Sequence, residues 1–266
     1  MKILGFILLI VSGILFFVKK QQGSKSFSVK SARPVQISEL KQLAGEIADE
    51  IGGGNWRDYV KVYGTVLCDR PLTSELKQQP CVYYRMSVKR RYEEIVTRKD
   101  ESGKTQKTTS QRTQTVASNQ QSVPFRLRDR HGDEIEVNPT GADIETIKVV
   151  SEFQPEGGNH LEIRFGGFSQ TLGTVTPRAN TKTLGYEYSE SLLPVDRQML
   201  VIGTASDVTG ELVLQRPVKS DKKFIISLKS DEELAANADQ GAKMAFYGMV
   251  GCGVMGLLLI VIGVLS

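Results

Sequence analysis

The sequence predicts a mainly β protein, an antiparallel sandwich or barrel-like domain between two transmembrane helices, with flanking amphipathic helices. Two uncharged apolar segments lie near the two ends of the 266 residues, Ile3–Val18 and Met244–Leu265. Between them, short runs rich in β-branched and aromatic residues alternate with turn residues, a pattern typical of antiparallel β proteins. We therefore expect both ends of the chain to hold the middle region against one face of a bilayer.

The two apolar segments differ in length. As helices rising about 1.5 Å per residue, Met244–Leu265 would reach about 33 Å and Ile3–Val18 about 24 Å, against a hydrocarbon core of roughly 30 Å. The shorter segment spans if the bilayer thins or if Lys2 and Lys19 extend to the headgroups. A cleaved signal peptide is the alternative for it. The sequence Lys19–Gln22, with no A-x-A cleavage site, favours an anchor.

Charge around the two segments predicts their orientation. Basic residues cluster on the inner side of each segment, which favours a cytoplasmic middle domain with both termini outside. The formal net charge is +4, and basic residues are mixed with acids, so the composition does not indicate nucleic-acid binding. The flanking basic residues are Lys19, Lys20, Lys25, Lys30 and Arg33 after the first segment, and Lys222, Lys223, Lys229 and Lys243 before the second.

Two further helices are predicted beside the β domain. Apolar residues recur at three- and four-residue spacing over Gln36–Ile51, which indicates an amphipathic helix ended by Gly52–Gly54. Ser230 and Glu233 form a capping box that starts a second helix at about Asp231. That helix runs toward the second apolar segment, either with a joint at Gly241 or continuously.

The middle region reads as one β domain of short strands. Thr97–Gln121 is almost wholly polar and cannot repay its ordering entropy by burial, so we expect a mobile polar loop or a long hairpin tip there. It is also the best exposed contact candidate. The predicted strands are Tyr59–Leu67, Cys81–Val88, Arg90–Val96, Pro124–Leu127 paired with Asp133–Val137, Ile144–Phe153, His160–Phe165, Gly185–Tyr188, Met199–Gly203, Glu211–Gln215 and Phe224–Ser227.

Small residues recur in the second apolar segment. Gly248, Cys252 and Gly256 fall on one helix face at four-residue spacing, which lets another helix approach closely. The partner helix is either the first segment or the same segment of a second copy, the latter giving a homo-oligomer.

The sequence contains none of the motifs that we would associate with catalysis. It has no P-loop and no G-x-S-x-G, and three Cys and two His are too few and too scattered for a zinc site. We expect no metal, no cofactor and no enzymatic activity. Cys68 and Cys81 would pair only in an oxidising compartment, and otherwise act as small apolar residues.

Several short motifs occur in a fixed order along the middle region. They are Val62–Val66; Pro80–Arg85 with Val88 and Tyr92; Val123–Asp129 with Gly132 and Val137; Gly185 and Tyr186 with Glu190 and Leu193; Leu200–Gly203; and Phe224–Ser227 with Lys229 and Leu234. In this order, and between two membrane segments, they resemble the GIDE family, also called the BAM ("beside a membrane") domain. The resemblance covers about residues 60–234.

The resemblance implies a membrane protein related to ubiquitin ligases. Eukaryotic members look like organelle outer-membrane E3 ubiquitin ligases, in which a RING follows the second span and binds zinc through Cys and His, four ligands to each ion. No RING position has a counterpart here, so we expect a RING-less, bacterial version. In the organelle relatives the domain faces the intermembrane space, whereas the lysines here favour the cytoplasm.

The family-signature residues have structural roles by this resemblance. The glycines suit turns or close backbone approach, and Arg85 would form an ion pair with Asp129 or Glu190. The set is Gly64, Cys81, Tyr84, Arg85, Pro124, Phe125, Asp129, Gly132, Gly185, Glu190 and Gly203.

Three functions follow as hypotheses. The first is a non-catalytic binding, scaffold or sensor domain that holds an unknown protein partner beside the lipid bilayer. The second is the substrate-recognition component of an E3 ubiquitin-protein ligase-like system whose RING is on another chain. The third is a structural membrane protein that self-assembles through its second span.

Overall fold

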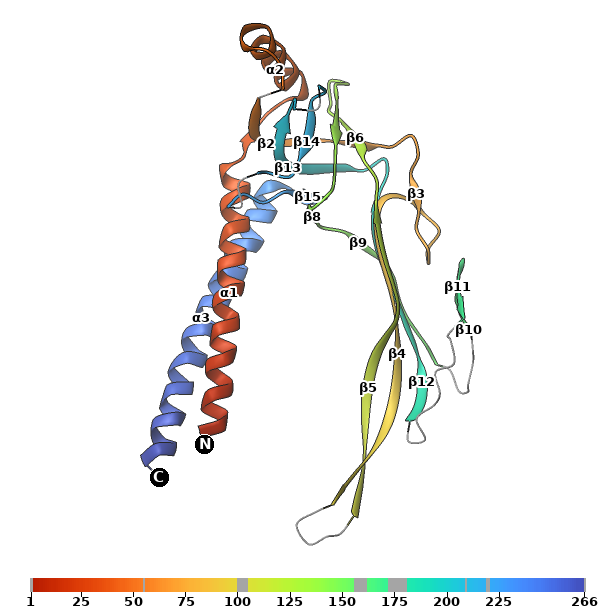
Figure 1. Ribbon diagram of the computed structural model, residues 1–266, viewed down its shortest axis with the longest axis vertical. Coiled ribbons are helices and arrows are strands. Elements are labelled where there is room, and N and C mark those ends of the chain that lie inside the picture. Colours follow the sequence, from red (N-terminus) through yellow and green to blue (C-terminus); the bar gives the residue numbers. More distant parts are fainter. Residues whose placement is uncertain are drawn as a thin grey trace. The chain divides into compact units, whose positions relative to one another are not determined.

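The computed structural model describes residues 2–54, 56–99, 105–155, 162–171, 181–208, 210–218 and 221–265. In these ranges most of the regular structure is strand, and the helices are α1 (Lys2–Ser31), α2 (Ile37–Ile51) and α3 (Asp231–Leu265) (Figure 1). The predicted mainly β fold between two long apolar helices is confirmed.

The chain forms two compact units where one domain was expected. The first, here the barrel unit, comprises Met1–Thr65, Arg126–Ile144 and Gln198–Ser266. The second, here the ribbon unit, comprises Val66–Phe125 and Glu145–Arg197. Each unit has a hydrophobic core of its own. Residues far apart in sequence build each unit, which is why the sequence pattern alone did not separate them.

The barrel unit is built on an eight-stranded sheet that closes on itself. Its strand order is β1-β2-β6-β7-β14-β13-β15-β8, and an additional pairing of β2 with β13 joins β2, β6, β7, β14 and β13 into a ring. The pairs β1–β2, β7–β14 and β8–β15 are parallel, so the sheet is mixed where an antiparallel one was predicted. The bounds are β1 (Arg33–Pro34), β2 (Arg57–Leu67), β6 (Phe125–Arg128), β7 (Glu134–Val137), β8 (Asp143–Ile144), β13 (Gln198–Ser206), β14 (Val213–Gln215) and β15 (Ile225–Ser227).

The end of α1 and the start of α3 complete the core of the barrel unit. Val29 of α1, Ala32 directly after it and Leu234 of α3 pack against strand residues. On the strands, the buried partners are Tyr59, Leu200, Ile202 and Ile225. The C-terminal end of α1 and the N-terminal end of α3 therefore join the barrel, and the apolar segments of both helices lie outside it.

Helices α1 and α3 run side by side in opposite directions, with both chain termini at the same end (Figure 1). The Ser12 hydroxyl donates to the Met249 carbonyl at 2.9 Å. A Cβ added to Gly256 would lie 3.0 Å from the Gly5 carbonyl oxygen, and one added to Gly248 would lie 3.1 Å from Leu15 Cδ1. The small-residue face of α3 is thus occupied by α1, the first of the two partners considered. Cys252 on the same helix is half-buried.

Both long helices extend past the apolar segments. α3 is continuous through Gly241, where an added Cβ would lie 3.3 Å from Gln22 of α1, so of the two alternatives at this glycine the structure has the continuous helix. α1 continues to Ser31 because its polar half still has contacts on α3. Asp239 accepts from the Ser26 hydroxyl and from Lys30 Nζ, each at 2.6 Å.

The ribbon unit contains a five-stranded sheet with the order β3-β4-β12-β9, to which β5 adds on β4. A separate hairpin consists of β10 and β11. The hydrophobic core of the ribbon unit includes Cys81, Tyr84, Met86 and Leu192. The bounds are β3 (Leu72–Thr73), β4 (Pro80–Lys99), β5 (Thr105–Ser122), β9 (Ile147–Pro155), β10 (Glu162–Phe165), β11 (Phe168–Thr171) and β12 (Thr181–Pro194).

The predicted mobile loop Thr97–Gln121 is largely strand. Residues 97–99 end β4, and residues 105–121 lie in β5, which pairs with β4 from Tyr83–Ser122 to Lys99–Thr105. Of the two expectations, the loop is therefore wrong and a long hairpin is right for the part of the segment that the structure describes. Backbone hydrogen bonds to β4, together with the strand preference of Thr, order a sequence that buries little apolar area.

Candidate functional site

Helices α1 and α3 expose an apolar surface. Both are long and apolar enough to cross a membrane, by length and composition. Large side chains stand out from the pair, with Ile3 78%, Phe17 70% and Tyr247 72% exposed. A surface of this kind on a folded protein calls for a lipid or protein cover, and the length of the helices matches a bilayer.

Aromatic and basic residues mark one end of this apolar surface. Phe17 on α1 lies two residues before Lys19, and Tyr247 on α3 lies four residues after Lys243. Lys19 Nζ lies 4.5 Å from the centre of the Phe246 ring across the helix pair. Aromatic rings followed by lysines are typical of the headgroup level of a membrane. This level is the boundary between the apolar part of the two helices and their polar part.

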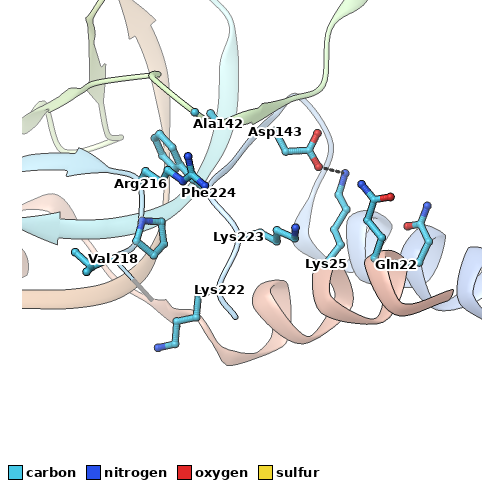
Figure 2. A pocket seen from close by; sticks show the side chains of 12 residues that line it. Gln22, Lys25, Ala142, Asp143, Arg216, Val218, Lys222, Lys223 and Phe224 are labelled. Atoms are coloured by element: carbon cyan, nitrogen blue, oxygen red, sulfur yellow. Dashed lines mark ion pairs between the residues drawn. The ribbon is translucent and has the colours of Figure 1, made fainter. Parts of the chain in front are cut away.

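A basic cavity lies directly past this boundary, where α1 meets the segment between β14 and β15 (Figure 2). We call it the juxtamembrane cavity. Its volume is about 650 Å³. It is lined by Gln21, Gln22, Lys25, Gly141, Ala142, Asp143, Arg216, Pro217, Val218, Lys222, Lys223 and Phe224.

Serines of α1 hold one wall of this cavity. The Lys223 amide donates to Ser28 Oγ at 2.9 Å, and the Ser24 hydroxyl donates to the Asp221 carbonyl at 3.3 Å. The Tyr59 hydroxyl donates to the Lys223 carbonyl at 2.7 Å, and burial raises the pKa of this phenol to about 12. Lys222 Nζ lies 4.4 Å from the centre of the Tyr59 ring. The two lysines are therefore presented by a segment that is fixed to α1 and to the barrel.

A second cavity, of about 520 Å³, lies near the start of α2, and two signature residues, Gly64 and Asp129, line it. Asp129 Oδ1 accepts from the amides of His131 at 2.9 Å and Asp133 at 3.1 Å. Its Oδ2 accepts from the amide of Ile37 at 3.3 Å. This carboxylate closes the β6–β7 turn and caps α2, so its hydrogen bonds serve the fold.

An arginine of the same cavity is also committed to the fold. Glu134 accepts from Arg128 and from Arg126, each at 2.6 Å. The hydrogen bond from Arg128, and then the charges of both arginines, hold the pKa of Glu134 below its usual value. Asp129 and Arg128, two charged residues of this cavity, are thus engaged in contacts within the fold.

Comparison with known proteins identifies the family. The GIDE family model, described as "E3 Ubiquitin ligase", matches residues 93–262, which is more than half of the chain. The chain belongs to the GIDE family. It is also 28% identical, over 139 residues, to the E3 ubiquitin-protein ligase SP1 of Arabidopsis thaliana. That alignment covers 52% of this chain and 37% of the plant protein, and no solved structure matches.

The signature residues of this GIDE protein do not meet in one site. The barrel unit holds Gly64, Asp129, Gly132 and Gly203. Cβ atoms added to Gly64 and Gly203 would lie 2.6 Å from the Arg128 carbonyl oxygen and 2.8 Å from the Phe224 ring, so both glycines permit close packing. Gly132 turns the β6–β7 hairpin at a φ of 93°. The ribbon unit holds Cys81, Tyr84, Arg85, Pro124, Phe125, Gly185 and Glu190.

The proposed ion pair of Arg85 with Glu190 is wrong. Glu190 is opposite Met86 in the sheet and Arg85 is opposite Ser191, so the two side chains leave opposite faces. Arg85 instead donates to the Tyr83 hydroxyl at 3.2 Å. The carboxylate of Asp129, the other suggested partner of Arg85, accepts hydrogen bonds from backbone amides.

Glu190 has a structural role. It is 1% exposed, and its two oxygens accept from the amides of Leu76 and Lys77, each at 2.8 Å. Nearby, burial raises the pKa of the Tyr84 hydroxyl above its usual value and that of the Cys81 thiol to about 11. The carboxylate thus holds the turn between β3 and β4 against the core of the ribbon unit.

In the part of the chain that the structure describes, no group of three or more His, Cys, Asp or Glu residues is placed to hold a metal ion. Cys68, Cys81 and Cys252 are free thiols.

Sequence reasoning missed the juxtamembrane cavity. It used Lys25, Lys222 and Lys223 as orientation charges only, and it did not single out Arg216 or Asp143. These residues come from three separate stretches of the chain that the barrel brings together. The available signal was the nearness of Lys222 and Lys223 to a predicted strand that precedes the second span.

Proposed function

We propose that this GIDE family protein is a membrane-anchored, non-catalytic binding or scaffold protein that presents a partner beside the bilayer. The observation that carries the proposal is the antiparallel pair of apolar helices α1 and α3. The ends of this pair that lie beyond the apolar segments contribute Val29 and Leu234 to the core of the barrel unit. Such a pair keeps the barrel at a fixed height above the membrane. Three carboxylates of the two units, Asp129, Glu134 and Glu190, are engaged in structural contacts, which supports a structural role for them over a catalytic one.

Site-specific photo-crosslinking tests the binding role. A photoreactive amino acid would replace Gln111, an exposed residue of β5, in the full chain within its native membrane. A matched control would carry the same group at Val254, an exposed position within the apolar part of α3. Discrete protein adducts from Gln111 but not from Val254 would support the proposal. Adducts to lipid alone from both positions would refute it.

We further propose that the middle region faces the cytoplasm, as the basic flanks of both helices favour. The test uses a Ser110→Cys variant in a Cys68→Ser background, because Ser110 is in β5 and Cys68 is half-exposed. We expect a membrane-impermeant maleimide to label the Ser110→Cys variant only after cell lysis. Labelling in intact cells would place the region outside, in line with the organelle relatives.

A second candidate is a recognition component of an E3 ubiquitin ligase system. The family description and the plant relative favour it, while this sequence, with three Cys and two His, lacks the ligands of a RING. The membrane-reconstituted chain would be added to a ubiquitin-charged conjugating enzyme. We expect no faster ubiquitin discharge from the chain alone, and a substrate-dependent increase only when a separate RING protein is present. Discharge by the chain alone would contradict both proposals.

A further inference from the structure

We propose that the juxtamembrane cavity binds the phosphate of an anionic lipid headgroup, with Lys25, Arg216 and Lys223 as its principal contacts. Above, Lys25 and Lys223 serve only as charges that favour one orientation in the membrane, and Arg216 has no role. The proposal rests on the charge of the cavity, on how its walls are built and on its height above the apolar segments, and it does not depend on a protein partner.

The charge of the cavity suits a phosphate. Its described lining contains four cations, Lys25, Arg216, Lys222 and Lys223, and one carboxylate, Asp143. The formal charge is therefore +3. Asp143 is engaged by Lys25 at 3.3 Å, at the edge of the cavity (Figure 2). Basic pockets beside membrane helices suit anionic headgroups, because each cation close to the surface adds electrostatic attraction.

The walls show that the cations are positioned by the fold. Gly141 has a φ of 76°, a backbone conformation that favours glycine, and a Cβ added to it would lie 2.9 Å from Arg216 Cδ, so the arginine stem rests against this turn. The backbone of Lys223 is fixed by Ser28 and by Tyr59. Asp143 itself is held by its amide, which donates to the Phe224 carbonyl at 2.7 Å. The groups that would bind phosphate thus come from a prearranged frame.

The height of the cavity favours a lipid over a free phosphate compound. Lys25 follows Val18 by about 10 Å along α1, at about 1.5 Å per residue. The headgroup layer extends roughly 5–8 Å past the hydrocarbon on each side, and long basic side chains reach down to it. Val218, which is 82% exposed, adds an apolar side chain to the lining. An amphipathic ligand satisfies both the cations and this apolar residue.

The experiment is native mass spectrometry of the full chain released from nanodiscs that contain equal amounts of phosphatidylglycerol and phosphatidylcholine. We expect one phosphatidylglycerol to be retained in preference to phosphatidylcholine. An Arg216→Gln/Lys223→Gln variant should lose this preference, by about five-fold for each cation and about 25-fold together. The matched control is Arg70→Gln/Lys89→Gln, which removes the same charges from exposed positions of the ribbon unit and should behave as the unaltered chain.

A gain-of-affinity variant guards against a folding defect in the double variant. Asp143→Asn removes the carboxylate from the lining and releases Lys25 from their ion pair, so phosphatidylglycerol retention should rise by about five-fold. Unchanged retention in Asp143→Asn, or equal retention in the double variant and its control, would overturn the proposal.

Competition with inorganic phosphate separates the two sources of phosphate. At millimolar concentration it should leave the retained lipid in place. If inorganic phosphate displaces the lipid, the cavity binds a soluble phosphate and the lipid assignment is wrong. Both lipids carry a phosphate, and phosphatidylglycerol alone has a net negative headgroup. Retention of both lipids in equal amounts would therefore show that the cavity has no preference for an anionic headgroup and would overturn the proposal.

Discussion

Replacing Glu190 by Gln should loosen the turn that precedes β4. Each carboxylate oxygen of Glu190 accepts one backbone amide, from Leu76 or from Lys77, at 2.8 Å in a site that is 1% exposed. A glutamine has one acceptor oxygen, so its NH₂ group would face one of the two N–H donors. Losing a hydrogen bond to a charged group costs about 1.5–3 kcal/mol.

Hydrogen exchange measures this cost locally. With a tenfold change for each 1.4 kcal/mol, the amides of Leu76 and Lys77 in Glu190→Gln should exchange roughly 10- to 150-fold faster. The control is Glu187→Gln on the same strand, whose carboxylate is 34% exposed and pairs with Arg91 at 2.8 Å. A surface pair is worth about 0–1 kcal/mol, so exchange at Leu76 and Lys77 should change little. Equal exchange in both variants would refute the role assigned to Glu190.

Three further predictions follow from named contacts. Cys81 is 0% exposed, and burial raises its thiol pKa to about 11, so a maleimide should label Cys68 in the native protein and Cys81 only on unfolding. Because the folded state opposes ionisation of Cys81, the contribution of the neutral thiol to stability is present below pH 9.0 and should be lost as the pH rises toward 11. An unfolding midpoint that stays constant over that pH range would contradict this prediction. Gly256→Ile places a branched side chain against Gly5 and Leu9, so a Ser12→Cys/Gly253→Cys pair, whose positions face each other across α1 and α3, should form a disulfide more slowly in that background; an unchanged rate would show that this packing is dispensable. Asp129→Ala removes the cap on α2 at a cost of about 0.5–2 kcal/mol, so exchange in the first turn of α2 should rise by about two- to 30-fold, whereas an unchanged rate would assign the cap to another group.

Local patterns were sufficient wherever one element decides the outcome. The length of Met244–Leu265 without charge, the spacing of apolar residues in Gln36–Ile51 and the Ser230–Glu233 cap each correspond to a helix in the structure, and the Glu233 amide does donate to Ser230 Oγ at 3.2 Å. These features depend on the periodicity and chemistry of neighbouring residues. The order of short motifs was likewise sufficient to indicate the GIDE family.

Pairing between distant strands was decided only by tertiary structure. The polar residues 105–121 form a strand because β4 supplies hydrogen-bond partners along its length, a stabilisation that no local pattern in this segment reveals. Glu190 and Arg85 look like a salt bridge in sequence, but the register of β12 against β4 puts them on opposite faces.

By itself, the sequence determined that this is a mainly β protein held at both ends by apolar helices, because hydrophobic length and alternation are local properties. The tertiary structure decided the division into two units, the occupation of the glycine face of α3 by α1 and the existence of the juxtamembrane cavity. Lys25, Asp143 and Arg216 are far apart along the chain, and only closure of the barrel against α1 places their charges around one space.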